Sequence, residues 1–382
     1  MGIDERSAAA LIYLLASKVN GKKADLPSDI QLSPVFSLAV KHGVGALCAS
    51  ALMDIGRCTE KMKKHRATAI LKIMLLDAER AAIGEELNKR GIAYLPLKGA
   101  LLKELYPAIG DREMSDNDIL IEPSKRKEVK KLFLERGYSV KVYGGPHDDV
   151  YLKLPAYNFE MHVSLFSKLD NREFSEYFKS ALKNSLVNKG NERKMTTEYF
   201  YLYMTAHEYK HYHHAGTGIR TLLDAYVFLR ANPNIDREVL SPELDALGLS
   251  EYERKRKALA FKLFSGDFAR ELMLGNATLS EEEAEMLSFY LGSGTYGTYT
   301  KLAENQIKKS GGSVGGYIRR RLFPPLEWYE ECAPLVYKHK ILIPFYLLKR
   351  AFVKVVLSPK KVIKEIKTIR KAKKENKNGI SR

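Results

Sequence analysis

Carboxylates at two places in the sequence have the spacing to share a metal ion. Asp116 and Asp118 are separated by one residue and lead into a short apolar run of the kind that forms a buried strand. Side chains alternate between the two faces of a strand, so both carboxylates point to the same side. Glu160 lies in the run 159–165, where polar and apolar residues alternate, and it shares the polar face with His162. This pattern predicts that Glu160 supplies a third carboxylate.

Three carboxylates that converge repel one another unless a cation lies among them. Oxygen ligands of this kind favour Mg²⁺ or Mn²⁺. The arrangement is typical of phosphoryl or nucleotidyl transfer, in which the ions neutralise a triphosphate and one carboxylate helps to deprotonate the attacking hydroxyl. We therefore predict that Asp116, Asp118 and Glu160 are both the metal ligands and the catalytic residues.

Groups suited to phosphate binding precede the two aspartates. Lys98 and Gly99 close a short β-type run and open a helical segment at 101–106. Backbone N–H groups and a lysine at such a turn can meet phosphate oxygens. Arg112 lies just before the aspartates, where a guanidinium can make a bidentate phosphate contact. We predict that Lys98, Gly99 and Arg112 bind the nucleotide.

The elements that must position these residues alternate between strand and helix patterns. Strand patterns cover 92–97, 118–121, 138–143, 149–154 and 157–165, and a helix pattern covers 124–136. Residues 91–190 are therefore predicted to form a mixed α/β unit that holds the chemistry. Helical periodicity dominates on both sides of it, over 1–90 and 191–337.

The net charge of +17 is concentrated at one end of the chain. Residues 338–382 contain fifteen Lys and Arg against two Glu, a charge of +13, which leaves +4 for the other 337 residues. Within this basic tail the stretch 341–357 is apolar with interspersed cations. We interpret it as a helix that packs on the body and is followed by a solvated end, with contact to an anionic membrane surface or to nucleic acid as alternatives.

Cysteine usage and hydropathy bear on the compartment. Cys48, Cys58 and Cys332 form no C-x-x-C pair, which gives neither a disulfide framework nor a thiolate zinc site. The apolar run 8–16 follows acidic residues, unlike a signal peptide, and no run is long enough to cross a bilayer. We therefore expect a cytoplasmic protein.

The order of these motifs resembles the uncharacterised nucleotidyltransferase family of the DNA polymerase β-like superfamily. The resemblance rests on Leu95-Pro-Leu-Lys-Gly-Ala-Leu-Leu, Leu105-Tyr-Pro, Arg112, Asp116-x-Asp118-Ile-Leu-Ile, Gly137-Tyr138 and Phe159-Glu-Met-His162. It extends into the helical region through His207, His211, Arg220 and Asp224, and covers roughly residues 70–350.

The resemblance implies an α+β fold and an activity. A small mixed β-sheet nucleotidyltransferase core at 91–190 would lie between an N-terminal helical segment, 1–90, and a C-terminal helical domain, 191–337, followed by the basic tail. The protein would transfer a nucleoside monophosphate from an NTP to an acceptor, with Mg²⁺ or Mn²⁺ as cofactor. The acceptor class (sugar, small molecule, protein or RNA), the base of the NTP and the oligomeric state stay open.

Family resemblance also assigns roles to individual positions. Lys98 and Gly99 stand where relatives carry a Gly-Ser phosphate-binding turn. Five further residues are candidates for the lining of the nucleotide or acceptor pocket: His162, His207, His211, Arg220 and Asp224.

Two other functions compete with this interpretation. His207, Glu208 and His211 match the H-E-x-x-H pattern of zinc metallohydrolases. This reading ranks third, because the family's H-x3-H pattern explains both histidines without Glu208. The second reading is a non-catalytic adaptor that keeps the fold and uses its basic tail on a membrane surface or an acidic partner.

Overall fold

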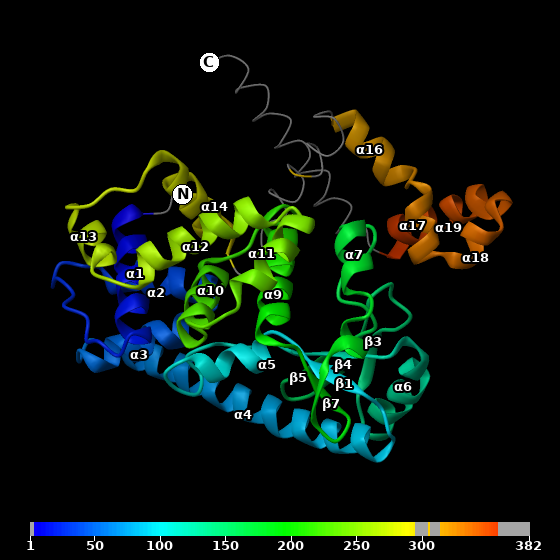
Figure 1. Cartoon of the computed structure of the whole chain (residues 1–382), viewed down its shortest axis with the longest axis horizontal. Helices are drawn as coiled ribbons and strands as arrows, with labels where there is room; N and C mark the ends of the chain where they lie inside the picture. Colours follow the sequence, from blue (N-terminus) through cyan, green and yellow to red (C-terminus); the bar gives the residue numbers. More distant parts are fainter. Residues whose placement is uncertain (1–3, 295–304, 306–313, 358–382) are drawn as a thin grey trace.

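The computed structural model describes residues 4–294, residue 305 and residues 314–357 of the 382-residue chain (Figure 1). The chain begins with four helices: α1 (Glu5–Val19), α2 (Leu32–Lys41), α3 (Gly45–Asp54) and α4 (Glu60–Lys89). Asp4 caps α1 by accepting hydrogen bonds from the backbone N–H groups of Arg6 and Ser7. The 30-residue α4 runs along the sheet (Figure 1). The predicted N-terminal helical segment is confirmed.

A mixed sheet of seven strands follows, in the order β3-β4-β5-β2-β1-β7-β6. The strands are β1 (Tyr94–Pro96), β2 (Asn117–Ile121), β3 (Ser139–Val142), β4 (Asp148–Lys153), β5 (Tyr157–His162), β6 (Leu186–Lys189) and β7 (Glu192–Lys194). Strand β2 is antiparallel to β1 and parallel to β5. The helices within this region are α5 (Gly99–Leu102), α6 (Arg126–Glu135), α7 (Arg172–Phe178) and α8 (Ala181–Asn184), with 3₁₀ turns at Lys103–Leu105 and Pro123–Lys125.

The two faces of the sheet are covered by different helices. Ile119 and Phe159 belong to a buried cluster with Leu87 of α4 and Phe133 of α6. On the opposite face Leu120 belongs to a cluster with residues of the next helix, α9 (Thr197–Tyr212). Since side chains alternate along a strand, Asp118 and Glu160 lie on the α9 side.

Asn117 fixes the strand that carries the aspartates. Its side chain is fully buried, donates a hydrogen bond to the carbonyl oxygen of Leu76 in α4 at 3.0 Å, and accepts one from Arg80 at 3.1 Å. A buried amide satisfied in this way resists any shift of β2 along α4, because a shift would leave polar atoms unpaired. The positions on both sides of Asn117, Asp116 and Asp118, are held accordingly.

Among the residues that the structure describes up to 294, six helices follow the sheet. Besides α9 they are α10 (Ile219–Ala231), α11 (Arg237–Ala246), α12 (Ser250–Phe264), α13 (Phe268–Leu274) and α14 (Glu281–Ser293). One hydrophobic cluster joins α1–α3 to α10 and to α12–α14. The N-terminal helices and the C-terminal helical region therefore share a core. The proposed domain boundaries at 90, 190 and 337 stay predictions.

The last described residues form a helical arm. It consists of α16 (Val314–Leu322), α17 (Leu326–Cys332), α18 (Pro334–Lys338), a 3₁₀ turn (Lys340–Leu342) and α19 (Ile343–Leu357). The helix expected at 341–357 is present, and residues 358–382 of the basic tail lie outside the described residues. Within the described part of the chain, no helix has the length and apolar character needed to span a bilayer. With a mixed sheet between helical regions, the predicted α+β fold is confirmed.

A buried acid in the loop before β2 makes stability depend on pH. Asp111 is fully buried, 3.8 Å from Arg66 Nε, and burial raises the pKa of its carboxyl from 3.8 to about 6 against the opposing effect of Arg66. The folded state therefore favours the protonated acid, and this contribution to stability is lost as pH rises through 6.

The variant Asp111→Asn tests this effect, because its side chain has no proton to lose. As pH rises from 4 to 7, its free energy of unfolding should increase relative to that of the native chain by up to about 3 kcal/mol. Urea unfolding across this range measures the difference. A difference between the two chains that is independent of pH would contradict the assignment.

Candidate functional site

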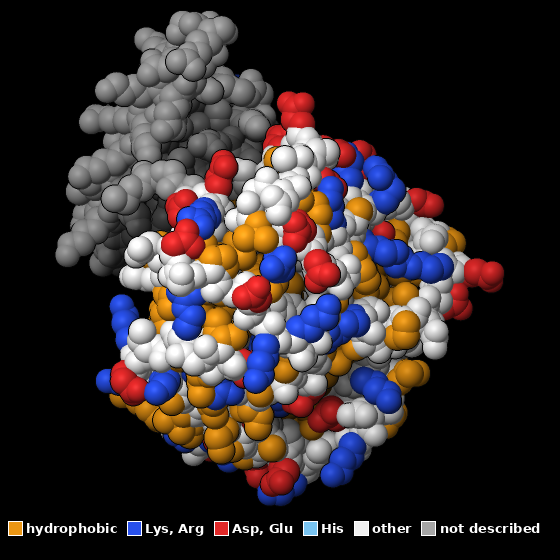
Figure 2. All heavy atoms as spheres, turned by 90° about the vertical axis from the view of Figure 1, so that its left-hand side faces the viewer, with side chains coloured by type: hydrophobic (Ala, Val, Ile, Leu, Met, Phe, Trp, Pro, Cys, Tyr) orange, Lys and Arg blue, Asp and Glu red, His pale blue; other side chains and the backbone are white. Residues whose placement is uncertain are grey.

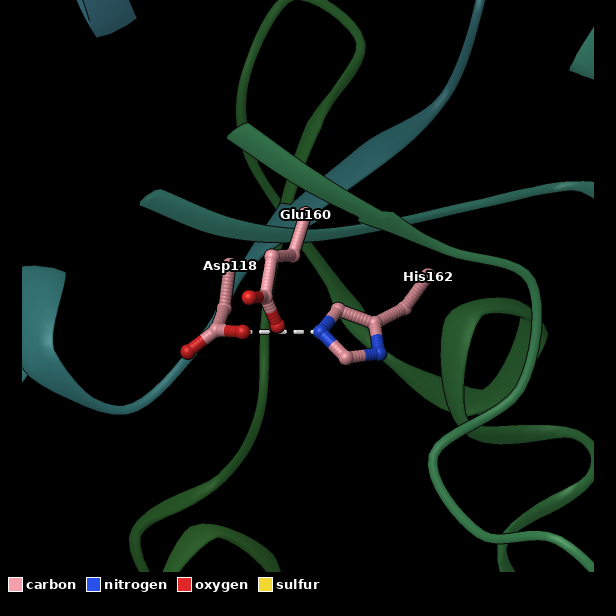
Figure 3. A group of neighbouring side chains, drawn as sticks. All are labelled: Asp118, Glu160 and His162. Atoms are coloured by element: carbon pink, nitrogen blue, oxygen red, sulfur yellow. Dashed lines mark hydrogen bonds and ion pairs between the residues drawn. The ribbon is translucent and has the colours of Figure 1, made fainter. Parts of the chain in front are cut away.

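Asp118, Glu160 and His162 form a group that can hold a cation (Figure 3). One ligand atom from each residue lies within 4.8 Å of the others. Asp118 of β2 is directly opposite Glu160 of β5 in the parallel register, and His162 follows two residues later on the same face. His162 Nε2 lies 2.8 Å from Asp118 Oδ1. The structure thus brings together two of the three predicted carboxylates and one predicted pocket histidine.

Asp116 lies at the edge of this group. It immediately precedes β2, and burial raises the pKa of its carboxyl, with a further contribution from Asp118. Asp116 in turn helps to raise the pKa of Glu160. Its carboxylate is therefore near the other two, although it is not a member of the 4.8 Å group. The role of Asp116 as a metal ligand stays a prediction.

The site concentrates negative charge with little water to screen it. Burial, followed by the charges of Asp118 and Asp116, raises the pKa of Glu160 to about 7. For Asp118, burial alone would raise the pKa, but Lys98 and His162 outweigh it and hold the pKa well below its usual range. A divalent cation would relieve the repulsion that raises the pKa of Glu160.

Lys98 contributes a positive charge to the carboxylate site without any bound ion. Its Nζ lies 3.4 Å from Asp118 Oδ2, and the side chain is 21% exposed. Among the described residues, Lys98 is the one non-glycine residue with a positive φ, at 40°. Such a conformation costs about 1–3 kcal/mol and is found at functional sites. It places the ammonium group at the carboxylates while the backbone turns into α5.

Gly99 is needed at this turn for a different reason. A Cβ atom added to Gly99 would lie 2.8 Å from Nη1 of Arg112. Arg112 itself is buried, and its Nε and Nη2 each donate to Asp224 of α10 at 2.8 Å. Tyr106 also donates to Asp224, at 2.7 Å. Arg112 is thus held between α10 and the Lys98–Gly99 turn.

This arrangement changes the role that we assign to Arg112 and Asp224. Two of the guanidinium nitrogens are used by Asp224, so a phosphate would compete with a buried ion pair for them. The predicted phosphate contact of Arg112 stays a prediction. The structure supports a positioning role, in which Asp224 orients Arg112 and Arg112 confines the turn.

Helix α9 covers the site with two neutral histidines. Nε2 of His207 and Nε2 of His211 are 3.2 Å apart. Burial, followed by nearby cations that include Lys98, lowers the pKa of both imidazoles, that of His211 to about 3. Both rings are therefore uncharged at neutral pH. They can exchange hydrogen bonds with a ligand but add no positive charge.

Two further residues of α9 lie near the site but are not among the candidates predicted from the sequence. The buried Tyr203 hydrogen-bonds to Lys98 and interacts with Asp118. Lys210 lies 3.4 Å from Asp170, and its charge acts on the imidazoles of His207 and His211. The helical spacing of 203, 207, 210 and 211 is the signal that could have placed them on one face.

A small pocket of about 210 Å³ opens next to Asp116. It is lined by Val40, Lys41, Gly43, His65, Thr68, Ala69, Lys72, Glu113, Met114, Ser115 and Arg220. Lys72 and Arg220 act on Asp116, since their charges oppose the rise in its pKa. Glu113 accepts hydrogen bonds from the backbone of Ala46 and lies 3.1 Å from His65. Because Lys72 and Arg220 line it, the pocket suits an anionic group close to the carboxylates.

Glu208 is not available as the base of a zinc hydrolase. It is buried, forms an ion pair with Arg256 at 2.8 Å, and accepts a hydrogen bond from Tyr290 at 2.5 Å. These partners lie in the helical core, whereas His207 faces Lys98. The H-E-x-x-H match reflects a structural glutamate beside two site histidines, which disfavours the metallohydrolase reading.

The structure places adjacent carboxylates on neighbouring strands, facing a turn that carries a lysine and a glycine. Residues 28–265 match a protein family described as "Uncharacterised nucleotidyltransferase", and the chain belongs to this family. The matched region contains the whole sheet and all three predicted acidic residues. No curated protein and no solved structure matches the chain.

Substitution of Lys98 separates its backbone role from its charge. Lys98→Gly and Lys98→Ala remove the same ammonium group, but only glycine adopts a positive φ without strain. We expect the glycine variant to be more stable than the alanine variant by about 1 kcal/mol, while both bind NTP more weakly than the native chain. Thermal unfolding and nucleotide titration measure the two effects. Equal stability of the two variants would contradict the assigned strain.

Glu208→Gln tests the structural role of this glutamate. It leaves Arg256 without its buried counter-charge and should reduce the free energy of unfolding by about 3 kcal/mol. Mg²⁺-dependent nucleotide binding at 10 °C or below, where the variant stays folded, should persist. Loss of nucleotide binding in a folded variant would show that Glu208 belongs to the site.

Proposed function

We propose that the protein is a metal-dependent nucleotidyltransferase that moves a nucleoside monophosphate from an NTP to an acceptor. The observation that carries this proposal is the pairing of Asp118 with Glu160 on adjacent parallel strands, where burial together with the charge of Asp118 raises the pKa of Glu160 to about 7. A pair of carboxylates this crowded favours a bound cation. Family membership independently supports an NTP as the donor.

The residues present fit Mg²⁺ or Mn²⁺. Asp118 and Glu160 offer hard oxygen ligands, and Asp116 lies near enough to contribute a third. His162, whose Nε2 is 2.8 Å from Asp118 Oδ1, would orient that carboxylate through an Nε2–H donor. In its other tautomer the same nitrogen would instead be a metal ligand, which Mn²⁺ accepts more readily than Mg²⁺. When bound, the cation would neutralise triphosphate charge and polarise the reacting phosphorus centre.

The remaining groups divide between the donor and the acceptor. Lys98 and the backbone of Gly99, which stand where relatives carry a Gly-Ser phosphate-binding turn, would bind the triphosphate. The carboxylate of Glu160 would orient or deprotonate the acceptor hydroxyl. His207 and His211 would line the pocket as neutral hydrogen-bonding groups.

We also propose a cytoplasmic location, where NTP and Mg²⁺ are plentiful. The described cysteines, Cys48, Cys58 and Cys332, are all free thiols, as expected in a reducing compartment.

A second candidate is a non-catalytic adaptor with the same fold. The observation that favours it is the ion pair between Lys98 and Asp118, because a lysine can replace a metal ion as the counter-charge of a carboxylate. An adaptor of this kind would bind NTP weakly or not at all, with or without Mg²⁺.

Nucleotide binding with matched variants distinguishes the two functions. Asp116→Asn, Asp118→Asn and Glu160→Gln should each weaken Mg²⁺-dependent binding of NTP at least about tenfold, and the double variant of Asp116 and Asp118 should abolish turnover. Glu122→Gln is the control, because this exposed acid lies just past the end of β2. The measurement is titration of labelled ATP, GTP, CTP and UTP with and without Mg²⁺, together with pyrophosphate release. An active double variant would overturn the proposal, and a native chain that binds no NTP would favour the adaptor.

A further inference from the structure

The helical arm carries an exposed apolar stripe. Ile341, Phe345, Leu348 and Phe352 recur at intervals of four, three and four residues, which places them on one face of α19 and the turn before it. They are 81%, 69%, 71% and 69% exposed. Of the 25 large apolar side chains that are exposed in the described part of the chain, ten lie between Leu322 and Phe352. Such a concentration marks an interaction surface.

The opposite face of α19 is occupied, so the stripe has a fixed orientation. Arg350 lies over the ring of Trp328 at 4.3 Å, and Tyr346 packs against Trp328 and Tyr329 of α17. Tyr329 is buried. The arm therefore has an inner aromatic face, and the stripe points away from α17.

The segment that carries the stripe has charge of one sign. Residues 332–357 contain five Lys and Arg and no Asp or Glu, and the acidic residues Glu327, Glu330 and Glu331 lie before it on α17. Lys338, Lys340 and Lys349 are exposed beside the stripe. On the face of the body drawn in Figure 2, by contrast, cationic and anionic side chains are interspersed. The basic character of the arm is thus a local property.

We infer that the stripe and its flanking lysines dock on an anionic membrane surface. A convex helix with projecting Phe, Leu and Ile side chains and adjacent lysines fits the boundary between acyl chains and anionic headgroups. A second copy of the arm is a poor partner, because it would bring two all-cationic segments together. The inference is independent of the proposed function, since it uses no residue of the carboxylate site.

Docking would also place the carboxylate site relative to the membrane. Glu331 of α17 accepts hydrogen bonds from Ser167 Oγ and Lys168 N, both at 2.5 Å, and Glu330 pairs with Lys168 at 3.2 Å. Ser167 and Lys168 lie in the segment that leaves β5 after His162. Figure 1 shows the arm at one side of the molecule, next to α7. The arm is therefore attached close to the end of β5, the strand that carries Glu160. Docking of the arm would thus fix the position of the carboxylate site relative to the membrane.

Vesicle co-sedimentation of the full chain tests the inference. We expect binding to phosphatidylcholine vesicles that contain about one third phosphatidylglycerol, weak binding to pure phosphatidylcholine, and a decrease with added salt. The triple variant Phe345→Ser, Leu348→Ser, Phe352→Ser should bind at least about tenfold more weakly. Lys338→Gln with Lys340→Gln and Lys349→Gln should lose about fivefold per lysine.

Matched variants control for general surface effects. Leu71→Ser with Met74→Ser removes two apolar side chains of α4 that are 58% and 57% exposed, and Lys61→Gln with Lys64→Gln removes two exposed cations. Both should bind vesicles like the native chain, and thermal unfolding confirms that each variant is folded. Absence of binding to anionic vesicles would overturn the inference. So would unchanged binding of a folded triple serine variant, or concentration-dependent dimerisation that the same substitutions abolish.

Discussion

The parallel pairing of β2 with β5 is the constraint on which the site depends. It sets Asp118 beside Glu160, two carboxylates that repel each other in a place with little solvent. The structure offsets this repulsion with Lys98 and His162, which stabilise the charge of Asp118 while the pKa of Glu160 stays raised. The protein thereby holds a pair of ligands whose charge is only partly compensated. The proposed divalent cation would complete this compensation.

Several buried polar contacts serve to keep that pair in place. Asn117 fixes β2 against α4, and the Arg112–Asp224 pair ties the loop before β2 to α10. Removing one member of such a contact leaves the other buried without a partner, which is costly. Helices before and after the sheet therefore both contribute residues that position β2 and the Lys98–Gly99 turn.

Much of this site follows from the sequence, because strand alternation is a local property. The apolar run that follows Asp118 and the alternation around Glu160 are enough to place these two carboxylates on the face where the structure has them, whereas Asp116 lies just before β2. The register of β2 on β5, which sets Asp118 against Glu160, is a long-range feature that no local pattern encodes. The same holds for the Arg112–Asp224 pair, whose members are 112 residues apart.

Other elements were missed for identifiable reasons. Strands β6 and β7 are short, and β6 is exposed throughout, so they lack the alternation by which strands are found. In helix α9 residues 200–206 are all buried, so no single polar face stands out in the sequence to mark the positions of Tyr203 and Lys210. The apolar run 341–357 predicts a helix that packs on the body, but only the arrangement of the arm shows that one apolar face stays exposed.

The central claim is that Asp118 and Glu160 jointly hold a divalent cation in the presence of nucleotide. Electron paramagnetic resonance of Mn²⁺ tests it most directly, since the signal of the free hydrated ion decreases as the ion binds. With the same NTP without protein as the reference, we expect the native chain to lower the free-ion signal further, and Glu160→Gln and Asp118→Asn to return it to the level of the NTP alone. A signal that the native chain lowers no further than the NTP alone, or that both variants lower as much as the native chain, would contradict this claim.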